Sequence, residues 1–212
     1  MIIMNKIKLE NLKTYIYIDS SNIRNALKVS HIDIDFGRLY KYLKNKYPKL
    51  QCVKYFEGID KKDRKKVKEF KKLGKVGYEI RTLSRKAYKN SAKYRTYKCF
   101  NCKEKNTVEI LKESKTFKSN IDVYLCSELM GDLLNVSTKS HAIILTCDGD
   151  YAEMIRNVLE RNKDVYISVL ATPFTEHNNY LSSRLKELNR IERYNLINIL
   201  SIKDRISKKG NK

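Results

Sequence analysis

Residues 141–156 read HAIILTCDGDYAEMIR, an apolar run that ends in two aspartates and continues as an amphipathic pattern. The run Ala142–Leu145 predicts a strand that is buried on both faces. From Tyr151 to Leu159 the apolar residues recur with the spacing of one helical face. Asp148 and Asp150 therefore fall on a strand-to-helix turn, at the carboxyl end of the strand, where parallel α/β sheets hold their ligands.

The two aspartates of this turn stand one residue apart, so their charges repel each other. A divalent cation bound to both carboxylates would offset this repulsion, because Mg²⁺ and Mn²⁺ take hard oxygen ligands. The alternative is structural: Asp150 caps the helix, and Asp148 shapes the turn around Gly149. The turn alone leaves both interpretations open.

The rest of the chain repeats a rhythm of strands and helices. Strands are predicted at residues 14–18, 52–56, 77–83, 142–145 and 164–171, and helices from Asp19 onward and at 36–47, 61–73 (capped by Asp60), 119–136, 151–159 and 180–188. Such a series predicts an α/β fold with a mostly parallel central sheet of about five strands flanked by helices. Residues 194–206 fit either a short edge strand or a final helix. We expect a leader at residues 1–13, a domain at 14–180 and a basic C-terminal helix and tail at 181–212.

The positive charge of the chain is regional. The net charge is +21, and residues 61–118 hold 21 Lys and Arg against 6 Asp and Glu. Residues 181–212 hold 9 against 3, so the remainder of the chain is balanced. A basic region beside a neutral body is typical of a protein that binds nucleic acid. An anionic membrane surface or a solvated lysine face are the alternatives.

Residues 84–118 interrupt the strand–helix rhythm with a basic insertion in which tyrosines and phenylalanines alternate with lysines. This composition suits a clamp that follows a single-stranded backbone and stacks bases on its rings. The alternative is a solvated insertion whose tyrosines attach it to the body. The side chains expected to contact nucleic acid are Ser21, Lys61, Lys62, Arg64, Lys65, Arg85, Lys86, Tyr88, Lys93, Tyr94, Arg95 and Lys118.

The five cysteines are odd in number and form no disulfide-like framework, which suits a reducing compartment. The N-terminal apolar run is too short for a signal peptide, and no segment approaches the ~18 apolar residues of a membrane-spanning helix. We therefore expect a soluble, cytoplasmic protein without a membrane partner.

Cys99 and Cys102 form a single CxxC within the insertion. It supplies only two ligands of a tetrahedral zinc site. A zinc ion would need His31, His141 or His177, or the same cysteine pair from the second subunit of a homodimer. The sequence therefore favours the absence of zinc.

Three motifs, in this order, resemble the NYN branch of the PIN-like, FLAP-like nuclease superfamily. The first is YIYID-SSN, the second IDVYLCSE at a helix start, and the third TCDGDY, which is similar to the family's Ser-Gly-Asp-x-Asp-Phe. The departures are Thr146-Cys147 for Ser-Gly, Tyr151 for Phe, Glu128 where an aspartate is usual, and Lys118, which stands one residue farther from Asp122 than the family's lysine. None of them removes an acid.

The resemblance implies a PIN-like three-layer fold and an endoribonuclease-type reaction with one or two Mg²⁺ or Mn²⁺ ions, RNA being favoured over DNA. It implies as catalytic residues Asp19, Asn22, Asp122, Asp148 and Asp150, and as metal ligands Asp19, Asp122, Glu128, Asp148 and Asp150.

This chemistry agrees with the expected fold, which brings the carboxylates of neighbouring strand ends together, where cations would offset their repulsion and activate a water. The chain has no Ser-His triad, glycine-rich phosphate loop or dinucleotide fingerprint. Three rivals remain. One is an RNA-binding member of the fold that does not cleave. Another is a haloacid-dehalogenase-type phosphohydrolase, which carries its Asp-x-Asp on the first strand. The third is a structural protein that does not bind nucleic acid, which would explain neither the acids nor the basic region.

Overall fold

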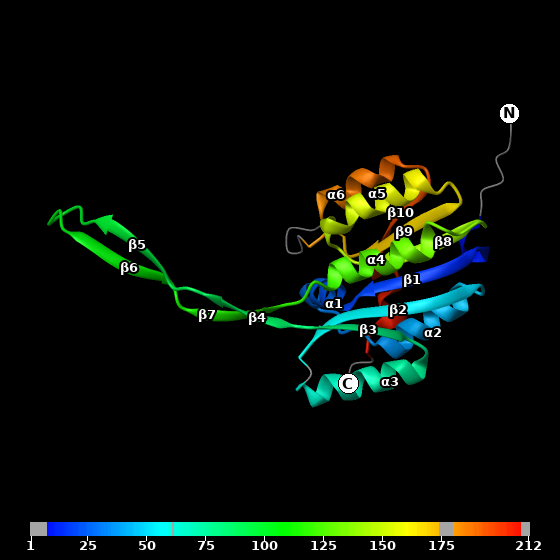
Figure 1. Cartoon of the computed structure of the whole chain (residues 1–212), viewed down its shortest axis with the longest axis horizontal. Coiled ribbons are helices and arrows are strands. Elements are labelled where there is room, and N and C mark those ends of the chain that lie inside the picture. The colour runs from blue at the N-terminus through cyan, green and yellow to red at the C-terminus, as the bar shows by residue number, and fades with distance from the viewer. Residues whose placement is uncertain (1–7, 61, 174–179, 209–212) are drawn as a thin grey trace.

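Six parallel strands form one sheet in the order β10-β9-β8-β1-β2-β3 (Figure 1). The structure is a computed structural model, and it describes residues 8–60, 62–173 and 180–208. The strands are β1 (Lys13–Asp19), β2 (Leu50–Ile59), β3 (Glu79–Ser84), β8 (Ser140–Leu145), β9 (Val165–Ala171) and β10 (Tyr194–Asn198). The α/β architecture predicted from the sequence is confirmed.

Helices cover both faces of this sheet. They are α1 (Ser20–Val29), α2 (Phe36–Lys46), α3 (Arg64–Val76), α4 (Ile121–Leu133), α5 (Ala152–Arg161), α6 (Ser183–Glu187) and α7 (Lys203–Ile206). Tyr55 of β2 packs edge-on against Phe36 of α2 and Phe70 of α3. Tyr17 of β1 instead donates a 2.8 Å hydrogen bond to Asp132 of α4. Because these rings leave opposite faces of the sheet, α2 and α3 form one outer layer and α4 belongs to the other.

Strands β1 and β8 lie side by side at the centre of the sheet, paired from Lys13↔Ser140 to Ile18↔Leu145. All of β8 is buried, as the apolar run of residues 142–145 predicts. From β1 the chain continues outward through β2 to β3, and it then crosses back to β8 and continues outward to β10. The order of strands therefore reverses between β1 and β8. This reversal is a topological switch point, the position where open α/β sheets bind ligands.

Two details of these elements differ from the sequence prediction. Residues 194–206, which fitted a strand or a helix, contain both: β10 adds a sixth strand at the sheet edge, and α7 follows it. The cap of α3 is Asp63, not Asp60, because Asp63 accepts 3.0 Å bonds from the N–H groups of Lys65 and Lys66. Asp60 accepts from Lys62 in the preceding turn.

The basic insertion forms a long two-stranded arm (Figure 1). At its base, β4 (Lys86–Asn90) pairs antiparallel with β7 (Ser114–Lys118), and farther out β5 (Lys93–Lys98) pairs with β6 (Lys105–Leu111). At about 3.3 Å per residue the arm reaches roughly 40 Å from the sheet. The expectation of a solvated insertion whose tyrosines attach it to the body does not hold, since Tyr88, Tyr94 and Tyr97 are exposed.

The arm leaves the sheet at the edge where the strands end. It follows β3 directly and leads into α4, so both of its roots lie at the carboxyl ends of the strands. Ser119 and Arg85 close over Gly58 of β2 so tightly that a Cβ at Gly58 would lie 2.2 Å from the Ser119 hydroxyl. The base of the arm is therefore packed against the same edge that carries Asp19.

Candidate active site

Four aspartates come from three elements that meet at the switch point. Asp19 is the last residue of β1, and Asp148 and Asp150 follow β8, the strand beside it. Asp122 lies in the first turn of α4, just after the arm. The parallel sheet brings the carboxyl ends of β1 and β8 to one edge, so residues far apart in sequence share one region.

The hydroxyl of Tyr151 joins two of these aspartates. Its oxygen lies 3.1 Å from Oδ2 of Asp19 and 3.1 Å from Oδ1 of Asp122. A phenol has one proton, so it donates to only one of the two carboxylates at a time. The carboxylate without this donor must hold a proton, or meet another positive partner, to avoid facing a lone pair. The geometry of Asp19 and Asp122 would therefore be stabilised by a positive charge near both carboxylates.

Asp19 is only 3% exposed, so water does little to stabilise its negative charge. Burial raises the pKa of the Asp19 carboxyl to about 6, the Asn22 N–H opposes this, and the charges of Asp122 and Asp148 add to it. Burial also raises the pKa of Asp122, which Tyr151 opposes and Asp148 and Asp150 reinforce. The negative charges of these aspartates therefore raise one another's pKa values.

The turn after β8 lines a cleft of about 450 Å³. Asp148 shapes the turn by accepting a 3.0 Å bond from the N–H of Asp150, as the structural alternative expected, but Asp150 does not cap α5, whose N-cap residue is Tyr151. Asp150 is exposed and stands 3.9 Å from Arg184. Asn22 also lines the cleft, and its side-chain oxygen accepts a 2.8 Å bond from the N–H of Cys147, so that Asn22 ties α1 to this turn.

The ligand chemistry of the aspartates fits a hard cation. Among the residues that the structure describes, no Lys, Arg or His forms an ion pair with Asp19 or Asp122. Within those same residues, no group of three or more His, Cys, Asp or Glu side chains is close enough to hold a metal ion. Mg²⁺ nevertheless needs only one or two carboxylates when water and substrate phosphate complete its shell. The pair Asp19 and Asp122 satisfies that smaller requirement.

Glu128, which the resemblance placed among the metal ligands, lies outside this group. Its carboxylate accepts a 2.6 Å bond from Lys54 and lies 3.5 Å from Arg81. The same lysine binds Asp132 at 2.5 Å, so Glu128 and Asp132 belong to one ion-pair network. Six residues along a helix turn a side chain well away from Asp122. The structure thus gives Glu128 a different partner.

The residues expected to contact nucleic acid lie around the same edge and along the arm. Lys62, Arg64 and Lys65 stand between the end of β2 and the first turn of α3, and all three are exposed. The others on the arm and its roots are exposed too: Arg85, Lys86, Tyr88, Lys93, Tyr94, Arg95 and Lys118. Ser21 is half-buried in α1, and Lys61 lies outside the described residues.

The CxxC forms the turn at the tip of the arm, far from the body (Figure 1). The N–H groups of Cys102 and Asn101 and the thiol of Cys102 lower the pKa of Cys99. His141 is buried in β8 and lies 2.8 Å from Ser168, and His31 follows α1, so neither stands near the tip. His177 lies outside the described residues.

Sequence reasoning missed three residues of this site. Tyr151 was read as an apolar residue of a helical face and as a replacement for phenylalanine in the signature, and no local signal showed that its hydroxyl would meet Asp19 and Asp122. Ser182 and Arg184 line the cleft from α6 and its cap. Their approach to Gly149, where the Ser182 hydroxyl would lie 2.1 Å from an added Cβ, depends on tertiary packing and leaves no local signal.

Comparison with known proteins gives one family and one solved structure. The family model described as NYN domain matches residues 13–186. A crystal structure of a protein of unknown function from Vibrio parahaemolyticus is similar, with a TM-score of 0.61 and 14% sequence identity, covering 96% of this chain and all of that one. At that identity the likeness concerns the fold. No curated protein matches the chain.

Proposed function

The chain belongs to the NYN domain family, and from this premise we propose that it is a divalent-cation-dependent nuclease that hydrolyses phosphodiester bonds in RNA. A nuclease-like function is what the NYN domain suggests. The divalent cation and the RNA substrate are the parts of the proposal that go beyond the family. The observation that carries the cation is the Tyr151 hydroxyl shared by Asp19 and Asp122, two acids that lack a positive partner among the described residues.

In this proposal Asp19 and Asp122 hold Mg²⁺ or Mn²⁺, with Asp148 and Asp150 beside them. A bound cation supplies activation of water and stabilisation of the leaving oxygen. Tyr151 holds Asp19 and Asp122 in place through its hydroxyl, and the N–H of Asn22 fixes the other oxygen of Asp19 at 3.1 Å. The cleft beside Asp148 admits the substrate.

The arm, in the same proposal, binds the RNA strand. It is rooted beside Asp122 and carries exposed rings and cations along its length. Phe100 at the tip is 86% exposed, with the Lys103 ammonium 4.6 Å from its ring centre, and Tyr94 is 63% exposed, so each ring has an exposed face on which a base can stack. Lysines and arginines on the same ribbon neutralise phosphates. Substrate bound along the arm is led to the acidic edge.

We also place the protein in the cytoplasm. All five cysteines are free thiols, which suits a reducing compartment. No helix of the described chain is long and apolar enough to cross a membrane.

Cleavage of labelled single-stranded RNA and DNA by the purified chain tests the function. We expect Mg²⁺- or Mn²⁺-dependent cleavage, faster on RNA, and a loss of at least about 10²-fold in Asp122→Asn and in Asp150→Asn, as for groups that position a metal. Glu153→Gln, an exposed acid in the first turn of α5, is the matched control and should cleave normally.

Binding without cleavage under every divalent cation would favour the rival function, an RNA-binding member of the fold that does not cleave. Cleavage at the normal rate by both Asp122→Asn and Asp150→Asn would contradict the proposed active site.

A further inference from the structure

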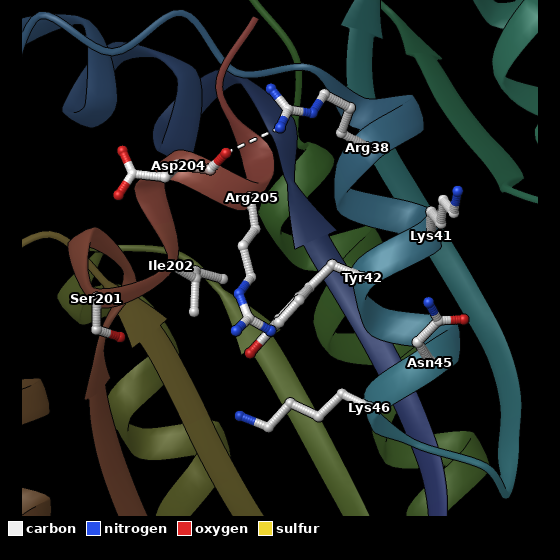
Figure 2. A pocket seen from close by; sticks show the side chains of 9 residues that line it. All are labelled: Arg38, Lys41, Tyr42, Asn45, Lys46, Ser201, Ile202, Asp204 and Arg205. Carbon is white, nitrogen blue, oxygen red and sulfur yellow. Dashed lines mark hydrogen bonds between the residues drawn. The ribbon is translucent and has the colours of Figure 1, made fainter.

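A second cleft, of about 790 Å³, lies between α2 and the C-terminal segment (Figure 2). Its walls come from two parts of the chain far apart in sequence. Arg38, Lys41, Tyr42 and Lys46 project from α2, and Asp204 and Arg205 from α7. The cleft is on the side of the sheet covered by α2 and α3, opposite the α4 layer that carries Asp122.

The lining is strongly cationic. It holds four basic residues and one acidic residue, Asp204. Figure 2 shows the Asp204 carboxylate pointing away from Arg205. In the described part of the chain, Lys41, Lys46 and Arg205 form no ion pair. An anion is therefore the ligand whose charge complements the cleft.

Two of the cations converge on one ring. The Nζ of Lys46 lies 5.6 Å from the centre of the Tyr42 ring, and the guanidinium carbon of Arg205 lies 5.7 Å from it. Contact with the ring is favourable for each, but the two like charges repel each other. An anion bound beside Lys46 and Arg205 would attract both cations and so offset their mutual repulsion.

The C-terminal wall is held firmly against α2. The Arg38 guanidinium donates to the carbonyl oxygens of Ser207 and of Asp204, the latter at 2.8 Å. The N–H of Asp35 donates a 2.7 Å bond to the carbonyl oxygen of Ile206. Arg205 therefore stands on an anchored segment, and a ligand would pay little to order it.

We propose that this cleft binds the phosphate group of a nucleotide or of a polynucleotide, at a site separate from the carboxylates. Its volume lies in the range of about 300–1,000 Å³ that small-molecule sites occupy. Arginine and lysine are the usual partners of phosphate, the first through its planar fork and the second as a point charge. The site goes beyond the proposed nuclease function, because binding here needs neither cleavage nor a metal.

Isothermal titration of the full chain without divalent cations tests the site, with 5′-AMP, adenosine, inorganic phosphate and a short single-stranded RNA as probes. We expect 5′-AMP to bind and adenosine not to. The double variant Lys46→Glu/Arg205→Glu should weaken 5′-AMP by at least about tenfold, since two charge-assisted contacts are reversed. If the RNA weakens equally and competes with 5′-AMP, a polynucleotide phosphate uses the site; if only 5′-AMP responds, the site serves nucleotides.

The matched control is Lys44→Glu/Lys203→Glu. It makes the same change of charge on the same two elements, at exposed positions outside the cleft, and should leave 5′-AMP binding nearly unchanged. Lys46→Gln/Arg205→Gln, with its thermal unfolding recorded, guards against misfolding of the first variant. Equal losses in both charge-reversal variants, or equal binding of adenosine and 5′-AMP, would overturn the proposal.

Asp122→Asn separates this site from the proposed active site. It should slow cleavage by at least about 10²-fold and leave 5′-AMP binding intact. Loss of 5′-AMP binding in that variant would place the nucleotide at the carboxylates and refute the second site.

Discussion

At the scale of single residues, Tyr151 links the two aspartates that the fold brings together. It is fully buried, and its hydroxyl is the one donor that both Asp19 and Asp122 receive. The hydrogen bond favours the ionised form of each carboxyl and so opposes the burial that raises their pKa values. A phenylalanine, which stands here in the family signature, would fit the same space without this support.

Tyr151→Phe is expected to raise the pKa of Asp19 above about 6, because the variant loses a hydrogen bond that favours the carboxylate. A ¹³C NMR titration of the carboxyl carbon, without divalent cations, measures it. The sign for stability follows: a raised folded-state pKa adds stability that is present below the unfolded value of 3.8 and is lost as the pH rises through about 6. In Tyr151→Phe, where the Asp19 pKa is higher, this stability should be lost at a higher pH than in the unaltered chain.

Tyr194→Phe is the control for this substitution, since the Tyr194 hydroxyl is buried and has no hydrogen-bond partner in the described structure. It should not move the titration of Asp19. An Asp19 pKa that is the same in Tyr151→Phe as in the unaltered chain would show that the hydroxyl does not tune the site.

At the scale of elements, the arm exposes side chains that suit two different kinds of partner. Aromatic and aliphatic side chains are similarly exposed on it: Tyr97 is 51% exposed and Ile110 is 54% exposed. Bases stack on rings but gain little from aliphatic groups, so a nucleic-acid partner and a protein partner would use different side chains.

Tyr94→Ala/Tyr97→Ala is expected to weaken binding of a labelled single-stranded RNA by about 1–3 kcal/mol for each stacked base lost. Fluorescence anisotropy measures this in the Asp150→Asn background, where the RNA stays intact. Val108→Ala/Ile110→Ala removes exposed aliphatic groups from the same ribbon and should have a smaller effect. If the aliphatic pair weakens RNA binding as much as the tyrosine pair does, stacking of bases on Tyr94 and Tyr97 does not account for the binding.

The tip of the arm poses a separate question, because a thiol with a lowered pKa is a better zinc ligand. Two cysteines do not close a tetrahedral site, so we expect the untagged chain to carry no zinc by elemental analysis. Cys99→Ser/Cys102→Ser should melt at the same temperature as the unaltered chain. One zinc per two chains, together with a dimeric mass in solution, would instead show a four-cysteine site shared between subunits.

At the scale of the whole molecule, Lys54 joins the sheet to α4. It is only 6% exposed, and its ammonium group bonds Glu128 at 2.6 Å and Asp132 at 2.5 Å. Tyr17 of the neighbouring strand donates to the same Asp132 carboxylate. A lysine in the middle of β2 is thus tolerated because α4 supplies its charges.

Lys54→Met is expected to lower the free energy of unfolding by about 2–4 kcal/mol, since Asp132 loses its cation and Glu128 keeps only Arg81 at 3.5 Å. Thermal or urea unfolding measures the loss. Lys139→Met, at an exposed position without an ion pair in the described structure, should change stability little. Cleavage below the melting transition should survive in Lys54→Met, because Glu128 stands apart from the aspartates; its loss there would return Glu128 to the active site.

Local pattern alone determined the scaffold. The buried run at residues 142–145 and the helical spacing after Tyr151 predicted a strand, a turn and a helix, and the structure has them as β8, a short 3₁₀ turn and α5. Because parallel strands end at one edge, the positions of Asp19 and Asp148 in the sequence were enough to place both at that edge. Periodicity reports which face of an element is buried, and this requires no knowledge of its neighbours.

Only the tertiary structure decided which side chains meet across elements. The sequence around Glu128 does not predict its contact with Lys54. The sequence around Tyr151 does not predict its contacts with Asp19 and Asp122. The pairing of residues 93–98 with 105–111 in the arm, and of β10 with β9, likewise joins segments that are separate in the chain. Hydrogen bonds act over about 3 Å and depend on direction, so partners are set by how the layers pack. The sequence supplied the acids, and packing determined which of them face one another without a positive charge.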